Sequence, residues 1–234
     1  MEELFREDSY LKECPATVVA SSAEGIRLDR TIFYPMGGGQ PGDTGRLRFG
    51  DHVIEIVDTR KGTLPGEILH IPAEGSALPD TGAAVTAEID WDRRHRLMRM
   101  HTCLHLVCSL VKGDVTGGQI SDGKGRLDFN LAPETVLDKV ALTDALNLLI
   151  VGNHDVVPRW IADDELAARP ELVRTMSVKP PSGQGKVRLL DIAGVDLQPC
   201  GGTHVRNTAE IGLVEIVKIE SKGKMNKRVN LAFK

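Results

Sequence analysis

Two short fragments, far apart in the chain, constrain its fold more than any other feature. Each pairs two metal-ligating residue types four positions apart: His101-Thr-Cys-Leu-His105 and Cys200-Gly-Gly-Thr-His204. Together they supply three imidazoles and one thiolate, an ordinary ligand set for zinc. If the fold brings these two distant fragments to one point, it forms a metal site there.

The first fragment lies in a predicted helix. The sequence from residue 92 to about 112 predicts one helix, with Asp92 as its cap and Gly113 as its stop. On such a helix His101 and His105 project from one face, about 6 Å apart. Apolar residues recur at spacings of three and four and form a stripe for the core, made of Leu97, Met100, Leu104, Val107 and Val111.

The second fragment lies in a glycine-rich turn, where backbone freedom lets Cys200 and His204 converge. Two kinds of zinc site remain open at this point. Four protein ligands favour a closed structural site, whereas a histidine-rich site built from a helix and a loop is more typical of a hydrolytic one. The first fragment lacks the internal glutamate of His-Glu-x-x-His metalloproteases, which argues against peptide hydrolysis.

Composition excludes some classes of protein. The chain has 234 residues, 41% hydrophobic and 26% charged, which suits a globular protein of one or two domains. Its net charge of −4 argues against a globally basic nucleic-acid binder. No apolar run approaches the ~18 residues of a membrane span, and the acidic start does not resemble a signal peptide. We therefore expect a cytoplasmic protein that does not bind membranes.

The four cysteines are too few for a secreted disulfide scaffold in a chain of this length. Cys103 points about 200° away from His101 around a helix, so we expect it in the core rather than at the metal. We expect Cys108 in the core as well. With Cys14, these residues are interpreted as free thiols, which again favours a reducing compartment.

The chain divides into two predicted domains. Residues 1–90 contain short β-like runs cut by glycine, proline and aspartate, which predict a small barrel with strands at 16–20, 25–29, 52–58, 67–71 and 84–89. Residues 91–234 predict an α+β domain in which helices pack on an antiparallel sheet. Its second helix is expected at 133–151, and its strands at 118–120, 126–129, 187–192, 211–220 and 228–233.

These motifs together resemble a known family. The two metal-ligating fragments, followed by Thr208-Ala-Glu-Ile-Gly212, are similar to the editing domain of alanyl-tRNA synthetases and of the free-standing AlaX proteins. The run Phe33-Tyr-Pro-Met-Gly-Gly-Gly-Gln-Pro-Gly-Asp-Thr-Gly45 resembles the glycine-rich motif of the family's N-terminal barrel. The resemblance covers nearly the whole chain. It leaves no room for an aminoacylation core, so the chain looks like the medium-length free-standing form.

The resemblance implies an aminoacyl-tRNA deacylase. Its substrate would be alanine tRNA carrying a wrong amino acid, chiefly serine, with glycine as a second charge. A pocket shaped for alanine cannot exclude glycine and rejects serine only modestly, so a second hydrolytic site improves accuracy. Zinc suits that task because it polarises a carbonyl or lowers the pKa of a water. Mischarged alanine tRNA is thus the expected partner, and no obligate protein partner is evident.

By position, the resemblance makes His101, His105, Cys200 and His204 the zinc ligands. It places Gln119 near the scissile ester, and Thr116 in a position to contact a serine hydroxyl. The alternative for both residues is a solvated loop. Leu104 stands where many synthetase editing domains carry threonine, which removes a hydroxyl near the site.

Contacts with tRNA are expected from local features. The three glycines Gly37, Gly38 and Gly39 allow close backbone approach, although tight turns between strands explain them equally well. The polar side chains expected to contact tRNA are Gln40, Asp43, Arg93, Arg94, Lys222 and Lys224, and a solvated charged face is the alternative. The segment 179–186 resembles a mobile loop that closes on the terminal adenosine.

Two other functions compete with this hypothesis. A non-catalytic, zinc-stabilised RNA-binding module would use the same ligands as a closed structural site. Editing domains of threonyl-tRNA synthetases carry similar fragments, but they lack a segment like the glycine-rich residues 33–45.

Overall fold

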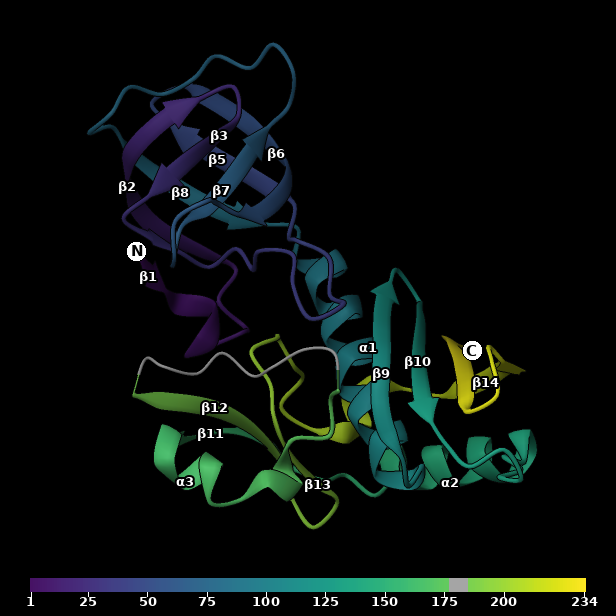
Figure 1. Ribbon diagram of the computed structural model, residues 1–234. Helices are drawn as coiled ribbons and strands as arrows, with labels where there is room; N and C mark the ends of the chain where they lie inside the picture. Colours follow the sequence, from purple (N-terminus) through teal and green to yellow (C-terminus); the bar gives the residue numbers. More distant parts are fainter. Residues whose placement is uncertain (177–184) are drawn as a thin grey trace. The chain divides into compact units, whose positions relative to one another are not determined.

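The computed structural model describes residues 1–176 and 185–234. Most of the predicted loop at 179–186 therefore lies outside the described residues. The chain forms two compact units, residues 1–95 and 96–234, and their boundary falls within helix α1 (Trp91–Leu110). Within the described ranges, none of the helices has the length and apolar character needed to cross a membrane. Each unit is shown in Figure 1.

Unit 1 is built on a closed barrel of six strands, connected by antiparallel pairing. Around the barrel the strands are β2 (Glu13–Ser22), β3 (Gly25–Leu28), β7 (Ile68–Pro72), β6 (His52–Lys61), β5 (Gly45–Phe49) and β8 (Ala84–Ile89). Alternate residues point inward, so that Leu47 of β5 is buried while Arg46 and Arg48 face outward. Both arginines contact Glu88 of the neighbouring strand β8. The predicted barrel is confirmed, and β5 is a strand that the sequence pattern did not predict.

Short elements complete unit 1. They are β1 (Glu2–Glu3), the 3-10 turn η1 (Leu4–Arg6) and β4 (Arg30–Thr31), with β1 and β4 paired in parallel. The glycine-rich segment contains a tight turn in which Gly37 and Gln40 exchange backbone hydrogen bonds of 3.1 and 2.9 Å. Gly38 and Gly39 at its tip have φ values of 57° and 83°, a left-handed conformation that glycine adopts without strain.

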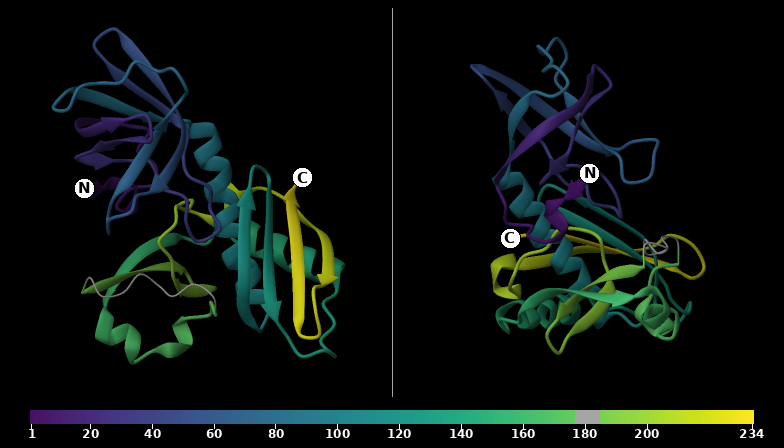
Figure 2. Two further views of the ribbon diagram at one scale, coloured as in Figure 1. Left: turned by 45° about the horizontal axis from the view of Figure 1, so that its top comes forward. Right: turned by 90° about the vertical axis from the view of Figure 1, so that its left-hand side faces the viewer.

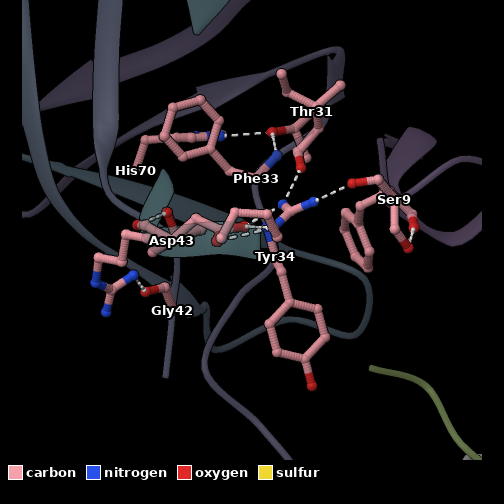
Figure 3. A network of polar contacts seen from close by, with 12 residues as sticks. Ser9, Thr31, Phe33, Tyr34, Gly42, Asp43 and His70 are labelled. Carbon is pink, nitrogen blue, oxygen red and sulfur yellow. Dashed lines mark hydrogen bonds and ion pairs between the residues drawn. The ribbon is translucent and has the colours of Figure 1, made fainter. Parts of the chain in front are cut away.

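A buried ion pair fixes this glycine-rich segment to the first turn of α1 (Figure 3). Arg94 is 0% exposed and Asp43 is 1% exposed. The guanidinium Nε donates to Asp43 at 2.9 Å, and the other two nitrogens donate to the carbonyls of Ser9 and Ile32 at 3.1 and 2.6 Å. The backbone N–H of Tyr34 also donates to Asp43, at 2.5 Å. Because every partner is a charge or a carbonyl, the buried guanidinium is well satisfied.

Unit 2 contains a four-stranded antiparallel sheet in the order β14-β15-β10-β9. The strands are β9 (Asp114–Ser121), β10 (Lys124–Asn130), β14 (Val214–Ser221) and β15 (Asn226–Phe233). Helix α1 packs on one face, where a Cβ atom on Gly125 would lie 2.7 Å from the sulfur of Met100. The glycine therefore permits the close approach of helix and strand. Helix α2 (Lys139–Val151) packs against β14.

The helix predictions hold with changed ends. All five residues of the predicted apolar stripe of α1 are buried. The cap is Asp90 rather than Asp92, because Asp90 accepts a hydrogen bond of 3.0 Å from the N–H of Arg93. Helix α2 begins at Lys139 rather than near Pro133, since the side chain of Asp138 accepts from two N–H groups of its first turn.

A second sheet in unit 2 has the order β11-β12-β13. Its strands are β11 (Val156–Ala162), β12 (Lys186–Ile192) and β13 (Asp196–Pro199), and only β12 was predicted. Helix α3 (Asp163–Ala167) and the 3-10 turn η2 (Pro170–Leu172) cover one face of it. A further turn, η3 (Thr208–Ile211), replaces the start of the predicted strand at 211–220. In Figures 1 and 2 helix α1 runs between the two sheets. The predicted fold class, a barrel followed by an α+β domain, is confirmed.

Candidate metal centre

The structure brings the two sequence fragments together. His101 and His105 lie on consecutive turns of α1, with ring centroids 5.5 Å apart, close to the spacing expected for a helix. Strand β13 ends directly before Cys200, and the following turn returns His204 to the same place. One ligand atom from each of the four residues lies within 4.8 Å of the others.

The spacing of the donor atoms matches a shared ion. Sγ of Cys200 lies 3.2 Å from Nε2 of His204 and 3.6 Å from Nε2 of His101. A tetrahedral zinc ion with bonds of about 2.0–2.3 Å separates its ligands by roughly 3.3–3.8 Å. The thiolate and imidazole donors therefore have both the chemistry and the spacing to hold a metal ion.

The hydroxyl of Thr102 selects the ligand nitrogen of His204. Its oxygen donates to the carbonyl of Met98 at 3.0 Å, so its only proton is used. The same oxygen lies 3.2 Å from Nδ1 of His204 and must accept a proton from it. Nε2 of His204 is then left with its lone pair, on the side where Cys200 lies.

A carboxylate determines which nitrogen of His105 faces the other donors. Nδ1 of His105 lies 3.2 Å from Oδ2 of Asp196, which leaves Nε2 as the ligand atom. The amide of Gln198 donates to both oxygens of Asp196, at 2.8 and 2.9 Å, and so fixes the carboxylate. The sequence patterns described above predict neither residue. Their alternate spacing before Cys200, Asp196-x-Gln198-x-Cys200, was the available signal, because it places all three on one face of a strand.

The turn that carries Cys200 is held from behind by a buried arginine. Nη1 of Arg188 donates to the carbonyls of Cys200 and Gly202, at 2.9 and 3.0 Å. At the far end of the turn, the buried hydroxyl of Thr208 contacts the carbonyl of Ile150 at 3.1 Å, in the last turn of α2. The position of the second fragment therefore depends on both β12 and α2.

Electrostatics favours the ligand form of Cys200. Burial raises the pKa of its thiol, but the charges of His101 and His204 and hydrogen bonds from His101 and His105 outweigh burial and hold the pKa well below its usual value. Burial lowers the pKa of His105, while the hydrogen bond to Asp196 and the neighbouring thiolate raise it, to a net value of about 10. The metal-free site thus favours a thiolate beside a protonated His105, so a metal ion that binds there displaces the proton from Nε2 of His105.

The other cysteines of α1 behave differently. Cys103 and Cys108 are buried, as expected for core residues. Burial raises the pKa of Cys103, and it raises the pKa of Cys108 to about 12. Both side chains are therefore neutral thiols near neutral pH and pack as small apolar groups.

Gln119 and Thr116 lie on strand β9, not in a solvated loop. Gln119 is exposed and accepts a hydrogen bond of 3.1 Å from Arg126 of the neighbouring strand. Thr116 contacts the amide of Asn226 at 3.4 Å. Ile120, the next residue after Gln119, is buried on the face that α1 covers, so Gln119 points to the opposite face. Its assignment to the substrate stays a prediction.

The residues expected to contact tRNA divide into buried and accessible sets. Gln40, Asp43 and Arg94 are buried, the last two in their mutual ion pair. A contact of Asp43 or Arg94 with RNA would require that pair to open, so we interpret both as structural. Arg93 is partly buried and donates to the carbonyl of Gly42 at 2.8 Å. The accessible set comprises Gly37, Gly38, Gly39, Lys222 and Lys224.

Comparisons with known proteins agree with this architecture. Residues 187–230 match the family "Threonyl and Alanyl tRNA synthetase second additional domain", and residues 7–93 match "tRNA synthetases class II (A)". The first match includes the second metal-ligating fragment.

Relatives cover the chain from end to end. Alanyl-tRNA editing protein AlaX-M of Saccharolobus solfataricus is 37% identical over 100% of this chain and 99% of its own length. AlaX-M of Methanosarcina acetivorans is 37% identical over 97% of each protein. Alanine–tRNA ligase of Metallosphaera sedula is 34% identical over 94% of this chain but over only 24% of the ligase. The resemblance predicted from the motifs is confirmed: this chain belongs to the family of alanyl-tRNA editing proteins.

Proposed function

We propose that this protein hydrolyses the ester bond of alanine tRNA mischarged with serine, and with glycine as a second charge, at a zinc site. The observation that carries the proposal is the convergence of His101, His105, Cys200 and His204 within 4.8 Å. Its support is the match over the full chain to relatives named alanyl-tRNA editing protein.

Hydrolysis of mischarged tRNA is needed because a synthetic site for alanine cannot fully reject glycine and serine. A synthetic site for alanine gains little binding energy from one methyl group, so glycine and serine enter it at a modest penalty. Hydrolysis at a separate site then lowers the error. The ligase relative matches this chain over 24% of the ligase, so the similarity is to one part of that enzyme.

Zinc would be held by the three imidazoles and the thiolate, and it would supply Lewis-acid chemistry at an ester carbonyl or a water. The protein's own residues prepare this site. Thr102 and Asp196 orient the rings of His204 and His105 so that Nε2 faces the other donors, and Gln198 fixes the carboxylate. Because these contacts exist before an ion binds, the rings need little reorientation, and the main change on binding is loss of the proton from Nε2 of His105.

Gln119 is proposed to contact the substrate from the rim of the site. Because Gln119 faces away from α1, this contact requires the substrate to pass around the edge of the sheet at β9, which is its edge strand. Thr116 lies three residues earlier on the same strand. If Gln119 orients the ester, Gln119→Ala lowers the deacylation rate at least tenfold while zinc content is unchanged. An unchanged rate would remove Gln119 from the proposal.

Contacts with the tRNA body are proposed at accessible positions only. Lys222 and Lys224 lie in the exposed turn between β14 and β15, where their charges can neutralise phosphates. The exposed glycine turn at Gly38 offers backbone without side-chain obstruction. The partly buried Arg93 lies at the start of α1 and adds one cation near the glycine-rich segment.

A deacylation panel tests the proposal. Purified protein is incubated with alanine tRNA charged with serine, glycine or alanine, and with threonine tRNA charged with threonine, each with and without a chelator. We expect release of serine and glycine, retention of alanine and threonine, and loss of activity with the chelator. Equal rates on all charges would contradict the specificity. Absence of hydrolysis with a tightly bound metal would favour the RNA-binding module instead.

A further inference from the structure

One face of the three-stranded sheet is turned toward the metal centre. Asp196 and Gln198 of β13 lie on it, and Asp196 bonds to the ligand His105. Leu197, between them, packs into the apolar cluster on the opposite face. Residues of β11 and β12 that share the first face are therefore neighbours of the metal centre across the sheet.

Trp160 lies on this same face. It is the direct partner of Arg188 in the pairing of β11 with β12. The N–H of Cys200 donates to the carbonyl of Arg188 at 3.0 Å, which continues the pairing of β12 with β13. Directly opposed residues of neighbouring strands point to one face. Trp160, Arg188 and Cys200 thus form a row across the sheet, and two strand spacings put Trp160 about 10 Å from Cys200.

The tryptophan ring is unusually accessible for its size. Trp160 is 43% exposed, although the residue opposite it, Arg188, is 5% exposed. Lys186, two residues before Arg188 on the same face, holds its ammonium 4.8 Å from the centre of the indole ring. An exposed aromatic ring and a cation thus lie together at the edge of the sheet beside the metal centre.

This pair has the chemistry of a nucleotide subsite. An aromatic ring stacks on any nucleobase, and an adjacent ammonium neutralises a phosphate. The ester of an aminoacyl-tRNA sits on its terminal ribose, so the terminal base lies only one nucleoside away from the reacting carbonyl. With that carbonyl at the metal centre, the base falls within the distance that separates Cys200 from Trp160.

We propose that Trp160 stacks on the terminal adenine of the substrate and that Lys186 binds the adjoining phosphate. This inference rests on the editing function proposed above and adds the subsite that positions the terminal nucleoside. Because a stacking platform recognises only the end common to all tRNAs, it contributes affinity and orientation rather than selection of alanine tRNA.

Kinetics on seryl-tRNA test the platform. Trp160→Ala should raise KM about tenfold and leave kcat within threefold of the native value. A tenfold change lies in the low to middle part of the loss of affinity expected when one base–aromatic stack is removed. Trp160→Phe keeps a ring and should restore KM to within threefold. Arg159→Ala, on the same strand but the opposite face, is the matched control and should leave both constants unchanged. Zinc content and circular dichroism of each variant show that the fold and the metal centre persist.

A binding measurement separates this inference from the proposed function. The chain has two tryptophans, so Trp91→Phe leaves Trp160 as the only one. Titration of this variant with adenosine monophosphate, and with a stable amide analogue of 3′-seryl-adenosine, should quench its fluorescence, whereas serinamide should not. The stacking role of Trp160 alone would be overturned if the native protein hydrolyses seryl-tRNA, Trp160→Ala leaves KM unchanged, and adenosine monophosphate does not quench the fluorescence of Trp160. If the native protein hydrolyses no ester, the proposed function fails, and quenching by the nucleotide still decides the platform.

Discussion

The hydroxyl of Thr102, which follows the proposed metal ligand His101 on α1, lies 3.2 Å from Nδ1 of His204. Thr102 is completely buried, and its proton is already donated to the carbonyl of Met98. A single oxygen thus connects the helical fragment to the turn fragment and decides which nitrogen of His204 is available to a metal.

Removing that oxygen should weaken metal binding. In Thr102→Val the shape is kept but the acceptor is absent, so His204 is no longer held in one tautomer. We expect zinc affinity to fall roughly 10- to 100-fold, measured by competition with a chromogenic chelator. Thr102→Ser keeps the hydroxyl and is the matched control, with affinity within threefold of the native protein. Equal affinities in the two variants would show that the hydroxyl does not orient the ring.

Asp196 should matter independently of Thr102, because it lies on strand β13 rather than on α1 and orients His105, a different proposed ligand. Asp196→Ala leaves Nδ1 of His105 without its carboxylate, and zinc affinity should again fall roughly 10- to 100-fold. Asp144→Ala, an exposed position on α2, is the control for loss of one negative charge. In cobalt-substituted protein, a changed visible spectrum for the Asp196 variant would show altered ligation. If both the spectrum and the zinc affinity are unaltered, Asp196 does not orient His105 for metal binding.

The sequence predicts those features that depend on residues a few positions apart, and it does not predict those that depend on contacts between distant residues. The stripe of α1 and the spacing of His101 and His105 are local, so the helix and its ligand face were predicted. Strand β11 was missed because its exposed residues, including Pro158 and Arg159, give no alternation of buried and exposed positions. Asp196 was missed because its partner, His105, lies 91 positions away.

The buried ion pair between Arg94 and Asp43 is a second example, because sequence patterns do not reveal which charged residues are buried. A charged residue is rarely fully buried, so the sequence predicts Arg94 and Asp43 at the surface, in contact with tRNA. Their burial arises from a contact across 51 positions, which composition and periodicity do not reveal. The contact of the glycine-rich segment with tRNA stays a prediction, whereas its Asp43 stabilises the fold of unit 1 through Arg94.

Breaking this pair should destabilise unit 1 strongly. Arg94→Met leaves the carboxylate of Asp43 buried without its charge partner, and we expect the free energy of unfolding to fall by about 3–5 kcal/mol. Arg48→Ala breaks two pairs on the barrel surface, with Glu13 and Glu88, and should lower the free energy of unfolding by only about 0–1 kcal/mol for each pair. Denaturant titration in a Trp160→Phe background, where Trp91 of unit 1 is the only tryptophan, measures both. Similar decreases in the two variants would argue against a structural role for Arg94.

The exposed lysines should control the salt dependence of tRNA binding. Replacing both Lys222 and Lys224 with alanine leaves up to two phosphates without a cation, so the slope of log affinity against log salt should decrease by about 0.9 for each such phosphate. Zinc content and hydrolysis at saturating substrate should persist. Lys139→Ala, at the exposed start of α2, is the control. An unchanged slope in the double variant would place the tRNA body elsewhere.

Finally, His70 should make the stability of unit 1 depend on pH. Burial lowers the pKa of this histidine to about 4, although a backbone hydrogen bond to Ile26 and the charge of Asp43 oppose the shift. Its Nδ1 contacts the Ile26 carbonyl at 2.9 Å and its Nε2 contacts the Thr31 hydroxyl at 2.8 Å, so the neutral ring is fully satisfied.

The sign of the effect follows from the lowered pKa. Well above pH 6.5 the ring is neutral in both the folded and the unfolded state, so it does not affect stability. As the pH falls through about 6.5 toward 4, the unfolded state takes up the proton before the folded state does, and stability decreases. Between pH 7.5 and 5 the decrease amounts to about 2 kcal/mol. His70→Gln cannot titrate and should show a correspondingly flatter profile by denaturant titration at the two pH values, whereas His52→Gln, at an exposed position, should follow the native protein. A native profile for His70→Gln would mean that other groups cause the acid sensitivity.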